Sequence, residues 1–371
     1  AGNDLYTSLD VNLQNYVTQA CEKVKKEKNA KQVSMILMNP QNGEIYAMAN
    51  VPEYNLNEPF KLNSRQQQAD SKKQQEYLNQ KWRNSCINDT YEPGSVFKIV
   101  TAAAGLESGK VKVTDHFNCP GFRIVEDRKI RCHKTTGHGS ETFREGVMNS
   151  CNPVFMEVGA RVGVDGMYDM FRKLGLFEKT GIDLPGEANS IMHKKKNVKA
   201  VELATMSFGQ SIQITPLQLL RAASAAVNGG KLITPHFGVR TVSADGKKEK
   251  IFEYPEKKGV IQKETSETLR DLLKAVVSEG SGRNCKIEGF SIGGKTATSE
   301  KLPRGNGKYI SSFLGFSKAE DPTVMGIVLI DEPEGTYYGG TIAAPVMRSV
   351  FQVALPYLGI SKDYTAEKEN E

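Results

Sequence analysis

The first fifty residues show two different spacings of apolar side chains. Residues 11–26 have apolar positions near helical spacing and predict a helix; these positions are Leu13, Val17, Ala20 and Val24. Residues 33–38 then alternate as a strand does, residues 39–43 are rich in turn formers, and residues 44–49 return as a second strand. The pattern therefore predicts a helix followed by a β-hairpin.

Strand patterns return near the end of the chain. Residues 309–317 and 323–331 are predicted strands joined by a turn at 319–322, and residues 343–358 are a predicted helix. Because the late strands can pair with the early hairpin, we expect one antiparallel sheet with helices on both faces. The expected fold class is α+β.

Helical patterns dominate the middle of the chain. From about 101 to 206 they predict a helical subdomain, interrupted by the segment 119–132, and further helices are predicted at 215–228 and 265–279. Residues 61–81 are rich in Gln and Lys and have almost no aliphatic side chains. Such a segment can bury little apolar surface, so we expect an exposed excursion without chemistry.

The composition is that of an ordinary globular protein, with 39% hydrophobic and 25% charged residues in 371. The net charge of +6, from 49 basic and 43 acidic residues, is too small and too scattered to indicate nucleic-acid binding. The most basic cluster, at 193–199, is expected to be a solvated loop. No apolar run reaches the roughly 18 to 20 residues needed to cross a bilayer.

One segment combines a predicted helix start with a nucleophile. Pro93 and Gly94 predict a sharp entry, so Ser95 is expected to open a helix, with Lys98 one turn further along the same face. A serine hydroxyl needs a nearby base at neutral pH, and a desolvated, neutral lysine is such a base. Alone, the pattern is also typical of an N-capping serine beside a solvent lysine.

Two further segments follow in order. Ser-Cys-Asn at 150–152 comes after a short predicted helix at 142–148, and Lys-Thr-Ala-Thr at 295–298 lies in a predicted strand after a Gly-Gly pair. Each segment alone is explained by loop caps or by a solvent charge on an edge strand. Three ordered motifs together favour a catalytic site over those explanations.

The three motifs resemble the Ser-x-x-Lys, Ser-x-Asn and Lys-Thr-Gly set of serine acyl transferases that act on D-alanyl peptides and react with penicillin. From about residue 9 to about residue 358, the chain resembles the transpeptidase domain of class B penicillin-binding proteins, in the division or sporulation branch of Gram-positive bacteria. Supporting matches are Ser8-Leu9-Asp10, the hairpin at 43–48, His138-Gly139, Phe208-Gly209-Gln210 and Ala343-Ala344-Pro345-Val346.

The resemblance implies a serine β-lactamase/D,D-peptidase-like fold, in which an antiparallel sheet is flanked by helices. Residues 1–8 are then expected to be a linker or a non-native remnant. Residues 9–358 would form the transpeptidase domain, with the helical subdomain inserted at about 101–206. Residues 359–371 would be a polar tail.

The resemblance also implies how the first two motifs act. Ser95 would attack the carbonyl of the penultimate D-alanine of a stem peptide, with Lys98 as the base, and the amine of a second stem would resolve the acyl-enzyme. Ser150 would relay a proton to the leaving amine, and Asn152 would hold the donor amide. The acyl transfer would require no cofactor.

The third motif would supply charge and hydrogen bonds. Lys295 would place positive charge near the substrate carboxylate, and Thr296 would hydrogen-bond that carboxylate. The N–H groups of Ser95 and Thr298 would form the oxyanion hole. Here the chain departs from the family, because Ala297 stands where glycine is usual. We interpret the substitution as tolerated, and weaker acylation by bulky lactams is the cost that its methyl group could impose.

A separate group of soft ligands lies between the first two motifs. A hairpin at 122–131 would bring Cys119 and Cys132 together, and His133 and His138 follow at once. These four residues are enough for a tetrahedral, structural zinc site. A disulfide between Cys119 and Cys132 and a pair of free thiols are the alternatives. Two other residues, Asp115 and His116, are spare candidates for a fourth ligand, and Cys151 is interpreted as a small packing residue.

The expected function is a peptidoglycan D,D-transpeptidase that cross-links stem peptides and is acylated by β-lactams. A serine β-lactamase or D,D-carboxypeptidase is one alternative, and a non-catalytic lactam sensor or scaffold is another. The resemblance further implies a membrane glycosyltransferase partner, reached through an N-terminal part that this chain lacks. It places the domain on the extracellular face of the cell membrane, held by an anchor in that same part.

Overall fold

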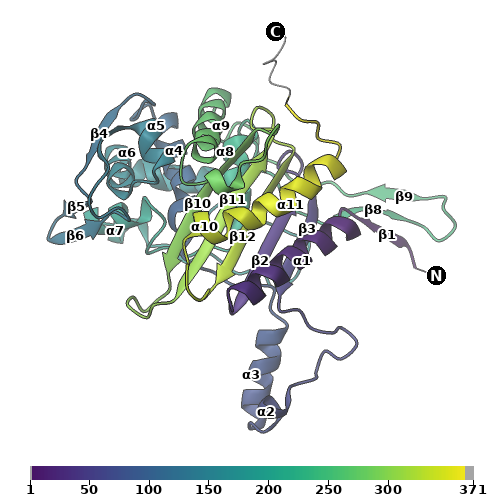
Figure 1. Cartoon of the computed structure of the whole chain (residues 1–371). Helices are drawn as coiled ribbons and strands as arrows, with labels where there is room; N and C mark the ends of the chain where they lie inside the picture. Colours follow the sequence, from purple (N-terminus) through teal and green to yellow (C-terminus); the bar gives the residue numbers. More distant parts are fainter. Residues whose placement is uncertain (1, 364–371) are drawn as a thin grey trace, which may run out of the picture.

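The centre of the molecule is a five-stranded antiparallel sheet (Figure 1), seen in a computed structural model that describes residues 2–363. In spatial order the strands are β10 (Ile292–Glu300), β11 (Tyr309–Ser317), β12 (Val324–Asp331), β2 (Gln32–Met38) and β3 (Ile45–Val51). All four pairings are antiparallel, and β12 pairs directly with β2. The predicted pairing of late strands with the early hairpin is therefore confirmed.

One face of the sheet is covered by the helices from the two ends of the chain, α1 (Val11–Glu27) and α11 (Ala344–Tyr357), which lie side by side (Figure 1). Along β2, Val33, Met35 and Leu37 belong to the core on this face, whereas Ile36 belongs to the core on the other. This division follows from the alternation of side chains along a strand. It explains why β2 is apolar throughout.

The opposite face carries three helices, α4 (Lys98–Glu107), α8 (Pro216–Val227) and α9 (Lys263–Ser278). Every residue of α8 is buried, so this helix forms the centre of the larger core. Thr215 caps α8 by accepting a hydrogen bond from the backbone N–H of Gln218, whose side chain in turn accepts from the N–H of Thr215. The sheet thus has helices on both faces, as expected.

The helical part beside the sheet contains α5 (Phe143–Met148), α6 (Asn152–Lys173) and α7 (Ala200–Met206), with a 3₁₀ turn at Lys195–Asn197. Two small antiparallel ladders accompany these helices. One joins β4 (His116–Cys119) to β7 (Gly139–Thr142), and the other joins β5 (Phe122–Val125) to β6 (Arg128–Arg131). The predicted hairpin at 122–131 is confirmed. A kink divides α6 at Gly163, whose φ is +74°.

Residues 61–81 form two helices, α2 (Ser64–Gln67) and α3 (Ser71–Lys81), in an arm that projects from the body (Figure 1). Neither helix has a buried residue, so the expected exposed excursion is confirmed. Residues 1–8 differ from expectation. The expected linker or non-native remnant contains β1 (Asp4–Thr7), which pairs with β8 (Gly238–Val242), and β8 pairs with β9 (Glu249–Ile251).

The remaining short elements are the 3₁₀ turns at Gly94–Phe97 and Arg283–Cys285 and the helix α10 (Gly339–Ile342). Residues 364–371 of the expected polar tail lie outside the described residues. Among the helices of residues 2–363, none combines the length and the apolar character that spanning a membrane would require.

Candidate active site

Ser95 lies in a 3₁₀ turn, Gly94–Phe97, and the α-helix proper begins only at Lys98. The turn is held from behind by the loop around Gly209, whose carbonyl oxygen accepts a hydrogen bond of 2.9 Å from the N–H of Gly94. The two backbones are so close that a Cβ on Gly209 would lie 2.1 Å from the carbonyl oxygen of Gly94. Only glycine fits at position 209, so the Phe-Gly-Gln segment positions the serine turn.

Lys98 is buried beneath this turn with 1% of its surface exposed. Its Nζ donates to the carbonyl oxygen of Ser150 at 2.7 Å, to the amide oxygen of Asn152 at 2.8 Å and to Ser150 Oγ at 3.2 Å. Burial lowers the pKa of the Lys98 amine from 10.5 to about 8. With this pKa, about a tenth of the Lys98 amine is neutral at pH 7.

Ser150 follows α5 in a left-handed backbone conformation, with φ +54°. Its hydroxyl oxygen also accepts a hydrogen bond of 2.7 Å from Lys295 Nζ. Lys295 comes from β10, where it pairs in register with Leu314. Burial, and after it the neighbouring charge of Lys98, lower the pKa of the Lys295 amine well below its usual value. Two buried amines thus share one serine hydroxyl.

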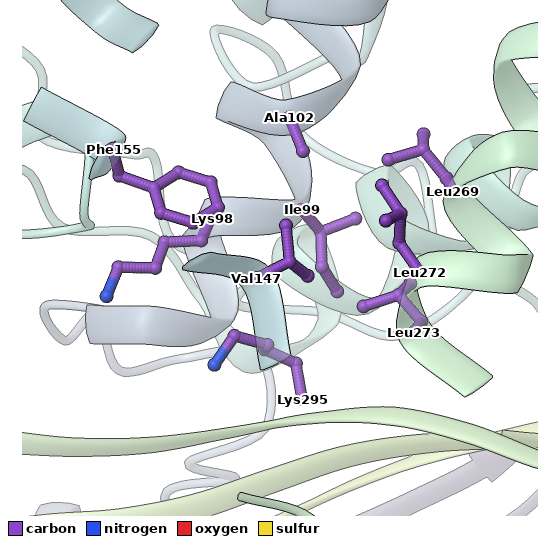
Figure 2. Close-up of a pocket in the computed structure, with 9 residues that line it drawn as sticks. All are labelled: Lys98, Ile99, Ala102, Val147, Phe155, Leu269, Leu272, Leu273 and Lys295. Carbon is purple, nitrogen blue, oxygen red and sulfur yellow. The ribbon is translucent and has the colours of Figure 1, made fainter. Parts of the chain in front are cut away.

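The stems of the two lysines border a small apolar cavity (Figure 2). Both nitrogen atoms point away from Leu269, Leu272 and Leu273, which close the other side of the cavity. The apolar surroundings leave the amines no water on this side, which is the physical cause of their lowered pKa values. The same packing directs both amines toward the cleft.

The cleft has a volume of ≈ 680 Å³ and is lined by side chains from all three motifs. Its lining includes Ser95, Ser150, Asn152, Thr296 and Thr298. With Lys98 and Lys295 buried at its floor, the structure brings together all seven residues proposed from the sequence. However, among the described residues no hydrogen bond joins Ser95 Oγ to Lys98 Nζ, whose donors are directed to Ser150 and Asn152 instead.

The threonines of the third motif have different partners. Thr298 Oγ1 accepts a hydrogen bond of 2.9 Å from the N–H of Gly339 and so anchors the start of α10 to β10. A Cβ on Gly339 would lie 2.2 Å from the carbonyl oxygen of Ala297, so this approach requires glycine. Thr296 Oγ1 donates to Ser281 Oγ at 3.2 Å.

Some residues of the cleft were not predicted. Ser281 lies in the loop after α9, and its short sequence signal, a serine between two glycines, is typical of many loops. An aromatic wall is formed by Tyr309, Tyr337 and Tyr338, with the rings of Tyr309 and Tyr337 stacked at 4.0 Å. Tyrosines at the end of a strand and in a loop have no spacing that would identify them as one surface.

A cluster of sulfur and nitrogen ligands includes the central residue of the second motif, Cys151. One ligand atom from each of Cys119, Cys132, His138 and Cys151 falls within 4.8 Å of the others. Three of these residues belong to the group predicted from the sequence. The fourth position is occupied by Cys151, interpreted from the sequence as a packing residue, and not by His133. All six cysteines of the chain are free thiols in the structure, so the alternative disulfide between Cys119 and Cys132 is not formed.

His133 stays at the edge of this cluster, with its Nδ1 3.8 Å from Cys132 Sγ. The hydrogen bond from Cys151, and after it the one with His133, lower the pKa of the Cys132 thiol, whereas the same bond raises the pKa of Cys151. Thiolates are the form in which cysteine binds metals. Three sulfurs and one imidazole within this radius are a donor set that zinc accepts with tetrahedral geometry.

Comparison with known proteins gives a consistent picture of the family. Residues 33–352 match the family described as penicillin binding protein transpeptidase domain. Stage V sporulation protein D of Bacillus subtilis strain 168 is 38% identical over 365 residues, a match that covers 97% of this chain and 54% of that protein. The probable peptidoglycan D,D-transpeptidase PenA of Neisseria flavescens is 31% identical over 369 residues, covering 97% of this chain and 84% of PenA.

Solved structures show the same likeness in three dimensions. The ligand-free crystal structure of penicillin-binding protein 3 from Mycobacterium tuberculosis superimposes with a TM-score of 0.86 at 26% identity, covering 97% of this chain and 81% of that one. A putative peptidoglycan glycosyltransferase from Atopobium parvulum superimposes with a TM-score of 0.83 at 28% identity, covering 97% and 81%. From these matches and the three converging motifs, we conclude that the chain belongs to the penicillin-binding protein transpeptidase domain family.

Proposed function

We propose that this domain is a serine D,D-transpeptidase that cross-links peptidoglycan stem peptides and is acylated by β-lactams. The observation that supports the proposal most is the position of Ser150 Oγ, which accepts hydrogen bonds from both Lys98 and Lys295 at the floor of the cleft that Ser95 lines. Residues from three separate parts of the chain meet there. The chain spans 54% of the Bacillus relative, so the activity of the whole protein is part of the proposal.

In the first half of the reaction, Ser95 Oγ attacks the carbonyl carbon of the penultimate D-alanine, and Lys98 Nζ takes the hydroxyl proton. The N–H groups of Ser95 and Thr298 stabilise the negative charge on the carbonyl oxygen. The C–N bond then breaks, and the leaving D-alanine amine receives a proton through Ser150. In the second half, the amine of another stem attacks the ester and releases Ser95.

In the structure, before any reaction step, Lys98 Nζ donates hydrogen bonds to Ser150 and Asn152 and not to Ser95. Catalytic hydrogen bonds are often long or unformed without substrate and tighten in the complex. Asn152 also donates from Nδ2 to the carbonyl oxygen of Arg131 at 3.1 Å, which fixes the orientation of its amide. A donor peptide that binds the Asn152 oxygen would compete for it with Lys98 and free the amine for Ser95.

The purified domain can be tested with a fluorescent penicillin and with a stem-peptide donor plus an amine acceptor. We expect stable labelling, an acyl adduct on the peptide that contains Ser95, and cross-linked product, all lost in Ser95→Ala. Rapid turnover of the label would indicate a β-lactamase, and release of D-alanine without cross-linking a carboxypeptidase. Labelling without either product would indicate a sensor. Equal labelling of Ser95→Ala would contradict the proposal.

The place of action and the partner are also part of the proposal. Peptidoglycan lies outside the cell membrane, so a domain with this activity would work on the extracellular face of that membrane. A membrane glycosyltransferase that supplies the glycan strands would be its partner. The match to a stage V sporulation protein supports a place in the sporulation or division branch.

We also propose that Cys119, Cys132, His138 and Cys151 hold a structural zinc ion. The donor set and its compactness support the proposal, and the acyl transfer itself needs no metal. A zinc assay of the purified protein, with Cys132→Ser as the control, should find close to one equivalent in the wild type and much less in the variant. Less than roughly a tenth of an equivalent would overturn it, because a closed structural site should be nearly full.

A further inference from the structure

Glu92 is a nearly buried carboxylate three residues before Ser95, and the acyl transfer described above makes no use of it. Only 9% of its side chain is exposed. Charged side chains are rarely buried to this extent unless they are paired. The partners of Glu92 come from two other segments of the chain, and both segments border the serine turn.

The two oxygens of Glu92 have different partners. Oε1 accepts a hydrogen bond of 2.8 Å from the backbone N–H of Ser211, which directly follows the Phe-Gly-Gln segment. Oε2 accepts a hydrogen bond from Nη2 of Arg304, in the turn between β10 and β11. One carboxylate thus joins the entry of the serine turn to segments that lie 119 and 212 positions further along the chain.

Arg304 is also tied to the strand that carries the third motif. Its Nη1 donates to the carbonyl oxygen of Glu300, the last residue of β10, and the N–H of Gly305 donates to Glu300 Oε1 at 2.6 Å. Glu300 comes two residues after Thr298, whose N–H is half of the proposed oxyanion hole. Arg304 therefore connects the strand of one oxyanion donor to the turn that holds the other, Ser95.

The serine turn and β10 pack closely at the same place. A Cβ on Gly94 would lie 2.2 Å from Ser299 Oγ and 3.5 Å from the Cβ of Ala297. Packing contacts of this kind have little directional preference, whereas hydrogen bonds depend strongly on direction. The hydrogen bonds of Glu92 and Arg304 therefore restrict sliding of the strand along the turn, which packing alone would allow.

We propose that Arg304 and Glu92 are positioning residues, whose ion pair sets the distance between the N–H groups of Ser95 and Thr298. The inference rests on the proposed function, because it concerns the oxyanion hole of that reaction. Both side chains act through the backbone and not on the substrate. An oxyanion donor is effective only within about 2.7–3.1 Å of the developing charge, so a small displacement of β10 weakens the stabilisation of the transition state.

The test uses penicillin acylation of the purified domain and measures two constants separately. These are the dissociation constant of the initial complex and the first-order rate constant of acylation within it. Arg304→Gln and Glu92→Gln each remove one charge of the pair, and Gln at position 92 keeps an oxygen for the N–H of Ser211. Lys308→Ala is the matched control, because it removes another ion pair of the same turn, 2.8 Å long, to Glu332 after β12.

We expect each Gln variant to slow acylation within the complex by about tenfold and to leave the dissociation constant of the initial complex unchanged. This loss is smaller than the roughly 10²- to 10³-fold loss on removal of an oxyanion donor, since the donor is displaced and not removed. The double variant should lose no more than either single variant, because both substitutions break the same contact. Lys308→Ala should match the wild type in both constants.

A wild-type acylation rate in Arg304→Gln would overturn the inference while leaving the proposed function intact. An equal loss in Lys308→Ala would also overturn it, and so would losses that add up in the double variant. If Glu92→Gln does not fold, the comparison of Arg304→Gln with Lys308→Ala decides alone. A wild-type domain that is not acylated on Ser95 would instead contradict the proposed function, before any variant is compared.

Discussion

Lys295 Nζ donates a hydrogen bond of 2.7 Å to the hydroxyl oxygen of Ser150, although the two residues are 145 positions apart in the chain. Lys295 comes from the edge strand of the sheet and Ser150 from the helical part, so this bond joins the two halves of the molecule. The same oxygen receives Lys98 Nζ at 3.2 Å. A single hydroxyl thus sets the relative positions of the two amines.

Substitution Ser150→Ala should therefore slow acylation strongly, whereas its effect on the free energy of unfolding should be small. The variant removes the shared acceptor and the proposed proton relay, and a positioned proton-transfer group typically contributes about 10²- to 10⁴-fold. The measurement is the second-order rate of labelling by a fluorescent penicillin. Ser281→Ala, which removes the partner of the Thr296 hydroxyl on the opposite wall, is the comparison and should lose much less. Similar losses in the two variants would contradict the role given to Ser150.

Acylation should depend on pH through Lys98. Its amine accepts a proton only when neutral, and burial lowers its pKa from 10.5 to about 8. The rate of penicillin acylation should therefore rise about tenfold per pH unit below about pH 8 and level off above it. Lys98→Arg, whose guanidinium stays charged, should lose both the rate and this pH dependence. A flat profile between pH 6 and 9 for the wild type would exclude Lys98 as the base.

The stability of the domain should also change with pH because of Lys98. The pKa is lower in the folded state, about 8, than in the unfolded state, where it takes its ordinary value of 10.5. Between these values the unfolded chain binds more protons, so the free energy of unfolding rises with pH, by about 1.4 kcal/mol per pH unit. Below about pH 8 both states are protonated and the cost of the buried charge is constant.

Urea unfolding of the wild type and of Lys98→Met at several pH values between 7 and 10 measures this effect. The difference between the two proteins cancels most titrations elsewhere in the chain. The free energy of unfolding of the wild type should increase relative to that of Lys98→Met as the pH rises above about 8. A difference that does not change with pH would mean that Lys98 has an ordinary pKa in the folded protein.

Most of the elements could be predicted, because strands and helices with a continuous apolar face depend on local periodicity. The predicted helix at 11–26 is α1, and the predicted strand at 309–317 coincides with β11. The start of the helix at Ser95 was predicted less well. The sequence indicates a turn there, but it does not distinguish a 3₁₀ turn from an α-helix over so few positions. The close packing of Gly209 against Gly94, which accompanies the turn in the structure, joins segments far apart in the sequence.

The metal-ligand cluster shows more clearly which part of the site could not be predicted from the sequence. Cys119, Cys132 and His138 could be grouped because a hairpin brings them together in sequence order. Cys151 reaches the cluster only through the packing of α5, which follows β7 and returns the chain to the hairpin. That approach depends on tertiary structure, and the apolar pattern around Cys151 is equally typical of a packing cysteine. The strand β1 was missed for a similar reason, since its partner β8 lies more than 230 residues away.

Ala297 stands where the family usually has glycine, and the variant Ala297→Gly tests what its methyl group does. Its side chain is buried, with 3% exposed, and its Cβ would lie 3.5 Å from a Cβ built on Gly94, so the methyl group faces the serine turn. Ala297→Gly should lower the free energy of unfolding by about 0.5–1 kcal/mol, because glycine loses more backbone entropy on folding. It should also accelerate acylation by lactams with large side chains more than by small ones. Equal changes for both kinds of lactam would show that the methyl group imposes no steric limit.

The position of β10 at the end of the sheet has a last consequence. Within residues 2–363, the strand order leaves one side of β10 without a neighbouring strand, and this is the strand that carries Lys295, Thr296 and Thr298. Free peptide groups along such an edge can pair with an extended backbone, as a sixth strand would. A stem peptide bound in this way would be aligned by its main chain, so stems that differ in their side chains could enter in the same register.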